Sequence, residues 1–85
     1  MTFAEGLGYA AGAVTTFTFL PQVIKTWKDR SAKDVSLMMF VIAVINEIMW
    51  ITYGILEKNM VIILTNAILL VMASTMIFFK LRFKE

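Results

Sequence analysis

Cysteine and histidine are both absent from this chain of 85 residues. Without cysteine there is no disulfide, no thiol nucleophile and no thiolate ligand for a metal, and without histidine the commonest general base and zinc ligand is missing. Aspartate and glutamate together number only six. We therefore expect no catalytic residue, no metal site and no cofactor, and we interpret the chain as a protein that is not an enzyme.

An excess of one charge is also lacking, since the formal net charge is only +2. This value is too small to indicate nucleic-acid binding, and no basic segment is interleaved with aromatic residues in a polar setting. Apolar residues, in contrast, make up 60% of the chain, and the mean hydropathy is +0.81. Soluble domains contain roughly 45–50% apolar residues. The composition therefore predicts an integral membrane protein surrounded by a lipid bilayer.

Three apolar segments, at residues 6–24, 35–56 and 60–79, contain Glu47 as their only charged residue. Each can cross a bilayer core of about 30 Å as a helix that rises about 1.5 Å per residue. The linkers between them are too short to hold a further domain. We expect an all-α membrane protein whose residues 1–85 form a single bundle of three transmembrane helices.

The basic residues predict an orientation in the membrane. Seven of the eight flank one side of the predicted spans: Lys25, Lys28, Arg30, Lys33, Lys80, Arg82 and Lys84. By the positive-inside rule, the N-terminus is expected outside and the C-terminus in the cytoplasm. No basic segment precedes the first span, so we expect this span to be retained rather than cleaved as a signal peptide. Asp34 or Ser36 is expected to cap the second helix.

Pro21, the only proline, lies inside the first apolar segment. Proline cannot donate to the carbonyl four residues back, here that of Phe17, so the helix must kink or open locally. Hydroxyl groups can satisfy the freed carbonyl in a membrane helix, and three threonines lie within one turn of it: Thr15, Thr16 and Thr18. Pro21 is either a moving hinge or a tolerated fixed kink.

Gly8 and Gly12, in the same segment, are two small residues spaced four apart. This pattern allows the backbone of another helix to approach closely. We interpret the pair as a packing patch rather than a substrate site, because small residues are frequent wherever membrane helices cross.

Residue number converts into depth at about 1.5 Å per residue from the midpoint of each span. Trp50 then lies about 7 Å and Asn66 about 5 Å to the outer side of the bilayer centre. In this setting Asn66 needs a hydrogen-bond partner, either another helix or a polar solute. An indole face opposite an amide suits a sugar, whose C–H faces are apolar and whose rim carries hydroxyl groups. Trp50 and Asn66 are therefore candidate substrate-binding residues.

Helical spacing from Trp50 groups further residues of the second span on one side, which we predict to face the lumen. They are Met39, Phe40, Ala43, Asn46, Glu47, Tyr53 and Glu57. Asn46 is a further substrate-binding candidate. Glu47 is either a functional carboxylate or a group that is held protonated or paired with lysine, asparagine or threonine.

Two sets of motifs resemble a known family. The run Phe19-Leu-Pro-Gln-Val-Ile-Lys25 is similar to the PQ motif of PQ-loop membrane transporters. The segment Ser36–Met39, the run Trp50-Ile-Thr-Tyr-Gly54, and Asn66 sixteen residues after the tryptophan resemble a bacterial SemiSWEET. The resemblance covers essentially all three spans.

This resemblance implies helices packed in the order first, third, second, and facilitative transport of small neutral sugars by alternating access in a bacterial inner membrane. It assigns Trp50 and Asn66 to the substrate pocket and Pro21 to a hinge, with Gln22 as the second residue of the PQ motif.

Both gates of the implied transport path can be assigned to residues. We predict the outer gate from Tyr53, Glu57 and Lys58, and the inner gate from Met39 and Phe40.

The sequence departs from the family pattern in three places. Asn46 stands where many bacterial members have glycine, and Glu47 occupies a usually apolar position. The run Glu57-Lys58-Asn59 replaces an arginine–aspartate gate pair.

A pore is expected only between two copies of the chain, because three helices of about 10 Å diameter leave no room for a solute between them. Since both copies share one charge bias, we predict a parallel homodimer around a central pore that binds about one sugar. Two Glu47 side chains would lie near each other if they faced the axis.

Two other functions are open at this point. Glu47 is compatible with a proton-coupled carrier of amino acids or another polar metabolite. The small size is compatible with a non-transporting membrane subunit.

Overall fold

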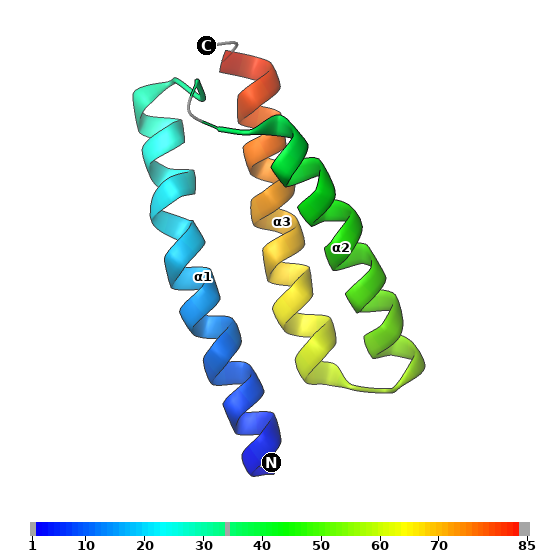
Figure 1. The fold of residues 1–85 in the computed structure, drawn as a ribbon. Coiled ribbons are helices and arrows are strands. Elements are labelled where there is room, and N and C mark those ends of the chain that lie inside the picture. Colours follow the sequence, from blue (N-terminus) through cyan, green and yellow to red (C-terminus); the bar gives the residue numbers. More distant parts are fainter. Residues whose placement is uncertain (1, 34, 84–85) are drawn as a thin grey trace.

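The computed structural model describes residues 2–33 and 35–83, and these residues form three helices (Figure 1). They are α1 (Phe3–Asp29), α2 (Leu37–Leu56) and α3 (Met60–Phe83). All three are long and apolar enough to cross a membrane. The predicted three-span, all-α architecture is confirmed. α1 extends beyond the predicted span at both ends, and α3 extends beyond its span at the C-terminal end.

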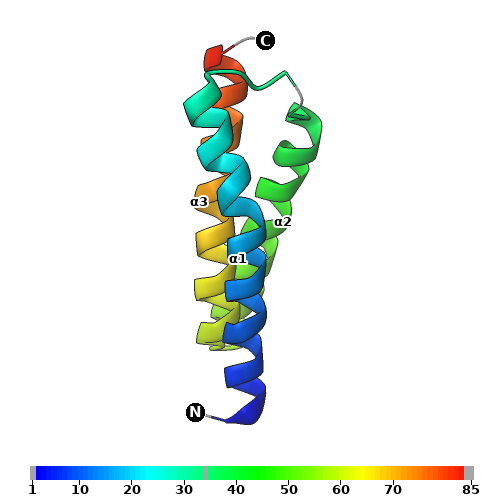
Figure 2. The same cartoon turned by 90° about the vertical axis from the view of Figure 1, so that its left-hand side faces the viewer.

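The helices form a layer in which α3 lies between α1 and α2 (Figures 1 and 2). α3 packs against both neighbours, whereas α1 and α2 are not packed on each other within the described part of the chain. The Cα positions extend over 44 × 21 × 13 Å. The order α1–α3–α2 agrees with the prediction, and the layer is about one helix thick.

Side chains cap all three helices, and two of these caps lie in the connections between helices. The Ser36 hydroxyl accepts a hydrogen bond of 3.2 Å from the Met39 amide at the start of α2. The Asn59 side-chain oxygen accepts one of 3.3 Å from the Ile62 amide at the start of α3. Each bond satisfies an amide that has no partner within its helix. Ser36 is thus the cap of α2, and Asp34, the alternative, lies outside the described residues.

The glycines of α1 are packed directly on α3. A Cβ added to Gly8 would lie 2.5 Å from Val61 Cγ1, and a Cβ added to Gly12 would collide with the Thr65 side chain. Only the absence of a side chain allows α1 to approach this closely. The predicted packing patch is confirmed.

α1 stays helical through Pro21, from Phe3 to Asp29. We expected the nearby threonine hydroxyls to satisfy the Phe17 carbonyl, but they donate to other carbonyls. Each hydroxyl donates to the carbonyl four residues before it: Thr15 to Ala11 at 3.0 Å, Thr16 to Gly12 at 2.9 Å and Thr18 to Val14 at 2.9 Å. The prediction was wrong because a threonine hydroxyl in a helix reaches the preceding turn of its own chain most easily.

The connection from α1 to α2 crosses the end of the bundle where α3 finishes (Figures 1 and 2). Lys80 Nζ on α3 donates a hydrogen bond of 2.9 Å to the buried carbonyl of Ala32 in this connection. The Arg30 guanidinium lies 5.7 Å from the centre of the Trp27 ring and 6.0 Å from that of Phe83. These contacts tie the C-terminal end of α1 to α3.

Candidate functional site

The predicted lumen stripe of α2 divides into two faces in the structure. Met39, Trp50 and Tyr53 are 53%, 46% and 49% exposed, but Phe40 and Glu47 are only 3% and 6% exposed. Phe40 and Glu47 are seven residues apart, so two helical turns place them on the same face, which packs on α3. The assignment of Phe40 and Glu47 to the lumen face is therefore corrected, and so is that of Ala43, which packs against the same core.

Phe40 belongs to the core of the bundle in this arrangement. It packs with Ala73, Met76 and Phe79 of α3. Met39, the other residue predicted for the inner gate, is exposed beside it. Phe40 thus holds α2 against α3, and Met39 is the exposed one of the two residues predicted for the inner gate.

Trp50 and Tyr53 form an exposed aromatic pair on α2. Their ring centres are 5.6 Å apart and their planes are perpendicular, which is a favourable edge-to-face geometry. The Tyr53 ring therefore helps to fix the orientation of the Trp50 indole. Asn46, one turn before Trp50, is also exposed. This side of α2 can offer an apolar stacking surface with an amide beside it.

Asn66 presents a second amide from α3. Its Nδ2 donates a hydrogen bond of 2.9 Å to the Ile62 carbonyl, within its own helix. This bond orients the side chain and uses one of two N–H groups, so the side-chain oxygen and the other N–H remain for another partner. No bond from Asn66 to another helix is formed within residues 2–33 and 35–83.

Trp50 and Asn66 lie at the same height in the helix pair. Trp50 is six residues before Leu56, the last residue of α2, and Asn66 is six residues after Met60, the first residue of α3. Because α2 and α3 are antiparallel and joined by a short turn, each residue lies about 9 Å from that turn. This arrangement is consistent with the prediction from residue numbers that Trp50 and Asn66 lie at similar depths in the membrane.

The α2–α3 turn carries two of the three predicted outer gate residues. Glu57 ends α2, and its amide bonds to the Tyr53 carbonyl at 2.9 Å. Lys58 adopts a left-handed conformation with φ 53°. Both side chains are exposed at the tip of the helix pair. The turn thus places a carboxylate and an ammonium group one turn beyond the Trp50–Tyr53 pair.

The PQ-motif residues lie on α1. Pro21 and Gln22 are both exposed in the single chain. Gln22 lines a crevice near the C-terminal end of α1, where Lys25 and Lys33 also lie. The described residues contain no group of three or more acidic side chains that could hold a metal ion.

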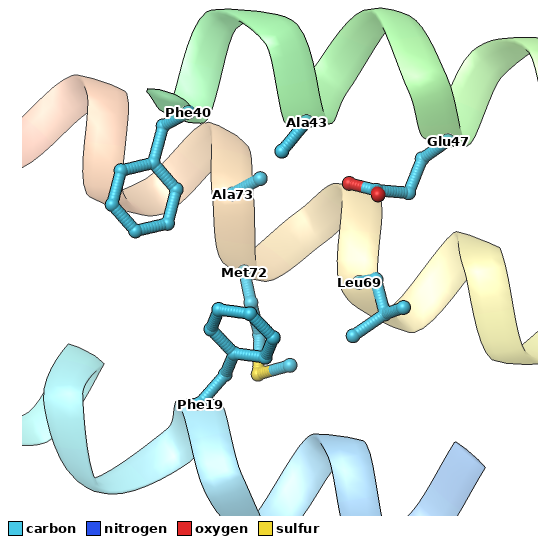
Figure 3. A pocket seen from close by; sticks show the side chains of 7 residues that line it. All are labelled: Phe19, Phe40, Ala43, Glu47, Leu69, Met72 and Ala73. Carbon is cyan, nitrogen blue, oxygen red and sulfur yellow. The ribbon is translucent and has the colours of Figure 1, made fainter. Parts of the chain in front are cut away.

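The burial of Glu47 between α2 and α3 was not predicted from the sequence. Its carboxyl points from α2 toward α3, into a cavity of about 40 Å³ (Figure 3). The other residues around this cavity are all apolar: Phe19, Phe40, Ala43, Leu69, Met72 and Ala73. The spacing of seven from Phe40 to Glu47 and from Glu47 to Gly54 places these three residues on one side of α2, but it does not identify that side as the buried one.

Comparisons with known proteins agree with this architecture. Residues 3–63 match the family model described as PQ loop repeat. The sugar transporter SemiSWEET of Bradyrhizobium diazoefficiens is 39% identical over 77 residues, which cover 91% of this chain and 90% of that protein.

Two solved structures have the same fold. A crystal structure of a bacterial homologue of SWEET transporters is 40% identical, with a TM-score of 0.90 over 96% of this chain and 99% of that chain. A crystal structure of SemiSWEET in the inward-open conformation is 31% identical, with a TM-score of 0.85 over 95% of this chain and 87% of that chain. These relatives are transporters and not enzymes, and the chain belongs to the SemiSWEET branch of the PQ-loop family of membrane proteins.

Proposed function

We propose that this chain is a facilitative carrier of small neutral sugars, with two parallel copies forming one pore. The observation that supports this most is the exposed Trp50–Tyr53 pair on α2, at the same height as the oriented Asn66 amide on α3. The indole face would stack on the C–H face of a sugar, and the amide would bond to its hydroxyl groups. The Bradyrhizobium diazoefficiens relative, which is named as a sugar transporter, supports the same substrate class.

The thin shape of the bundle is the reason for a homodimer. A layer about one helix thick has no interior large enough for a sugar, so the Trp50 and Asn66 side chains need a second surface opposite them. A two-fold axis along the membrane normal would supply that surface from an identical chain. In a bacterial inner membrane the N-terminus would lie outside and the C-terminus in the cytoplasm. The reason is that seven of the eight basic residues flank the same side of the spans as the C-terminus.

Alternating access then requires the two ends of the pore to open in turn. Tyr53, Glu57 and Lys58 would close the outer end, and Met39 the inner end. The solved relative in an inward-open conformation supports the existence of such a state in this family. Pro21 would allow α1 to bend within the span.

Reconstitution in liposomes tests this function. Purified protein should give saturable, downhill sugar flux with no ion gradient or nucleotide, and a binding screen over monosaccharides and disaccharides should identify the substrate. Liposomes without protein are the control. Protein that gives no saturable flux but co-purifies with one large membrane partner would favour a non-transporting subunit instead.

A proton-coupled carrier of amino acids or another polar metabolite is the second candidate, and the buried Glu47 carboxyl favours it. Imposed pH gradients distinguish the two functions. If a gradient drives uphill uptake and Glu47→Gln removes only the uphill component, the carrier is proton-coupled and the uniport proposal is wrong.

A further inference from the structure

The cavity at Glu47 has walls from all three helices. Phe19 comes from α1, and Leu69, Met72 and Ala73 come from α3, while Phe40 and Ala43 are neighbours on α2 (Figure 3). None of these six residues carries a titratable or charged group, or a side-chain N–H or O–H donor. The Glu47 carboxyl, in a side chain only 6% exposed, is therefore the only acidic group among the residues that line this cavity. Asn46, the preceding residue on α2, supplies a side-chain hydrogen bond to the carboxyl.

The size of the cavity limits what Glu47 can bind. One water needs about 10–15 Å³ of such volume, so 40 Å³ admits only about three or four waters, and no sugar or amino acid. A hard metal ion would need several oxygen ligands, and the wall supplies one carboxyl group. A proton needs only that group. Its binding also removes the charge that an apolar wall cannot stabilise.

Movement of α1 would change the surroundings of this carboxyl. Phe19 is the part of the wall that α1 contributes, and it lies two residues before Pro21. Within the described residues, α1 packs on α3 and not on α2. The Phe19 ring therefore extends over the surface of α3, beside Met72, to line the cavity (Figure 3). If the helix bends at Pro21, the Phe19 ring is withdrawn and water reaches Glu47.

We propose that Glu47 is a proton-binding site, occupied when the three helices enclose the cavity and emptied when α1 withdraws Phe19. The proton passes between the carboxyl group and water, and no other group changes. Glu47 lies one turn from Trp50 on α2. Protonation of Glu47 therefore changes the charge beside the helical turn that carries Trp50, a candidate sugar contact. The inference goes beyond sugar uniport, because the proton controls the movement of the carrier and need not travel with the sugar.

Carbodiimide labelling tests the site without any transport measurement. Dicyclohexylcarbodiimide, an apolar reagent, reacts with protonated carboxyl groups in apolar surroundings. In proteoliposomes it should modify Glu47, and the yield measured by mass spectrometry should fall about tenfold per pH unit above the titration point. Glu5 and Glu57, which are exposed to water, should stay unmodified. Phe19→Ala should make Glu47 reactive toward a water-soluble carbodiimide. If wild-type Glu47 reacts with the water-soluble reagent as readily as Glu5, the proposal is wrong.

Sugar flux at equal pH on both sides gives the second measurement. Wild-type flux should fall about tenfold per pH unit above the same titration point, because an unprotonated Glu47 cannot return to the enclosed cavity. Glu47→Gln should have a flat profile, and the matched control Glu5→Gln should keep the wild-type profile. The same pH dependence in Glu47→Gln would overturn the proposal. If the wild-type protein carries no sugar, the proposed function fails, whereas the labelling result still decides whether Glu47 binds a proton.

Discussion

At the scale of single residues, the contacts of Trp50 and Asn66 bear most directly on the proposed function. Asn66 bonds to Ile62 in its own helix, and among residues 2–33 and 35–83 it forms no bond to another helix. Trp50 is held by Tyr53 on an exposed face. Both side chains therefore have unused binding capacity, which favours contact with a solute over a purely structural role.

We expect Trp50→Ala and Asn66→Ala each to abolish sugar flux in liposomes, because they remove the stacking face and the oriented amide. Expression and dimer formation should stay near wild type. Trp27→Ala is the matched control, since Trp27 lies at the C-terminal end of α1, away from Trp50 and Asn66, and the contact between Arg30 and Phe83 remains when it is removed.

If Asn66 were mainly structural, Asn66→Ala would give a different pattern. Thermal or dimer stability would fall by about 1 kcal/mol, and the surviving dimer would keep nearly normal flux. Flux and stability measured on one preparation decide between these outcomes.

At the scale of elements, α1 joins α3 through glycines near its start and through the Lys80 contact with Ala32 near its end. Between these regions lies Pro21, which interrupts the hydrogen-bond ladder without ending the helix. α1 is thus a continuous helix that is fixed to α3 near both ends and has a weak point within the span.

Pro21→Ala should restore the amide donor to the Phe17 carbonyl and stiffen α1. We expect slower sugar flux in liposomes with sugar affinity close to wild type, because the change acts on movement rather than on contacts. Normal flux from this variant would show that Pro21 is only a fixed kink.

Gly12→Leu should separate α1 from α3, because even a Cβ at this position collides with Thr65. The expected loss of stability is about 1–3 kcal/mol or more, the usual range for overpacking. Thermal unfolding in detergent measures this loss. Ala11→Leu is the matched control, since Ala11 is exposed on the same turn. Equal melting temperatures for the two variants would contradict the packing role of Gly12.

At the scale of the whole molecule, the thin layer of helices sets the number of copies that a pore requires. Two parallel copies related by an axis along the membrane normal would bring two Trp50 and two Asn66 side chains to one depth. Glu47 points toward α3 within its own chain, so each copy has its own cavity (Figure 3). A dimer should therefore bind about one sugar but two protons.

A tethered mixed dimer tests the shared pore. One wild-type copy is joined to one Trp50→Ala copy through a linker with an added spanning helix, which the odd number of spans requires. We expect near-complete loss of flux, while a tether of two wild-type copies should transport normally. Half-normal flux with unchanged affinity would mean that each copy has an independent site.

The sequence alone determined the membrane class, the three spans, the glycine patch and the family, and it limited the cap of α2 to Asp34 or Ser36. These features depend on local composition, on segment length and on short motifs, all of which are readable along the chain. Helical spacing also grouped Trp50 correctly with Met39 and Tyr53 on one side of α2. None of these inferences required knowledge of where a neighbouring helix lies.

Only the tertiary structure decided which side of α2 packs on α3, and with it the burial of Phe40 and Glu47. In a soluble helix an apolar stripe marks the inward face, but in a membrane helix the lipid-facing and core-facing residues are both apolar. The spacing therefore gives the relative directions of side chains around the helix and leaves their direction toward the neighbouring helix open. That direction follows from the packing of α1 and α2 on opposite sides of α3.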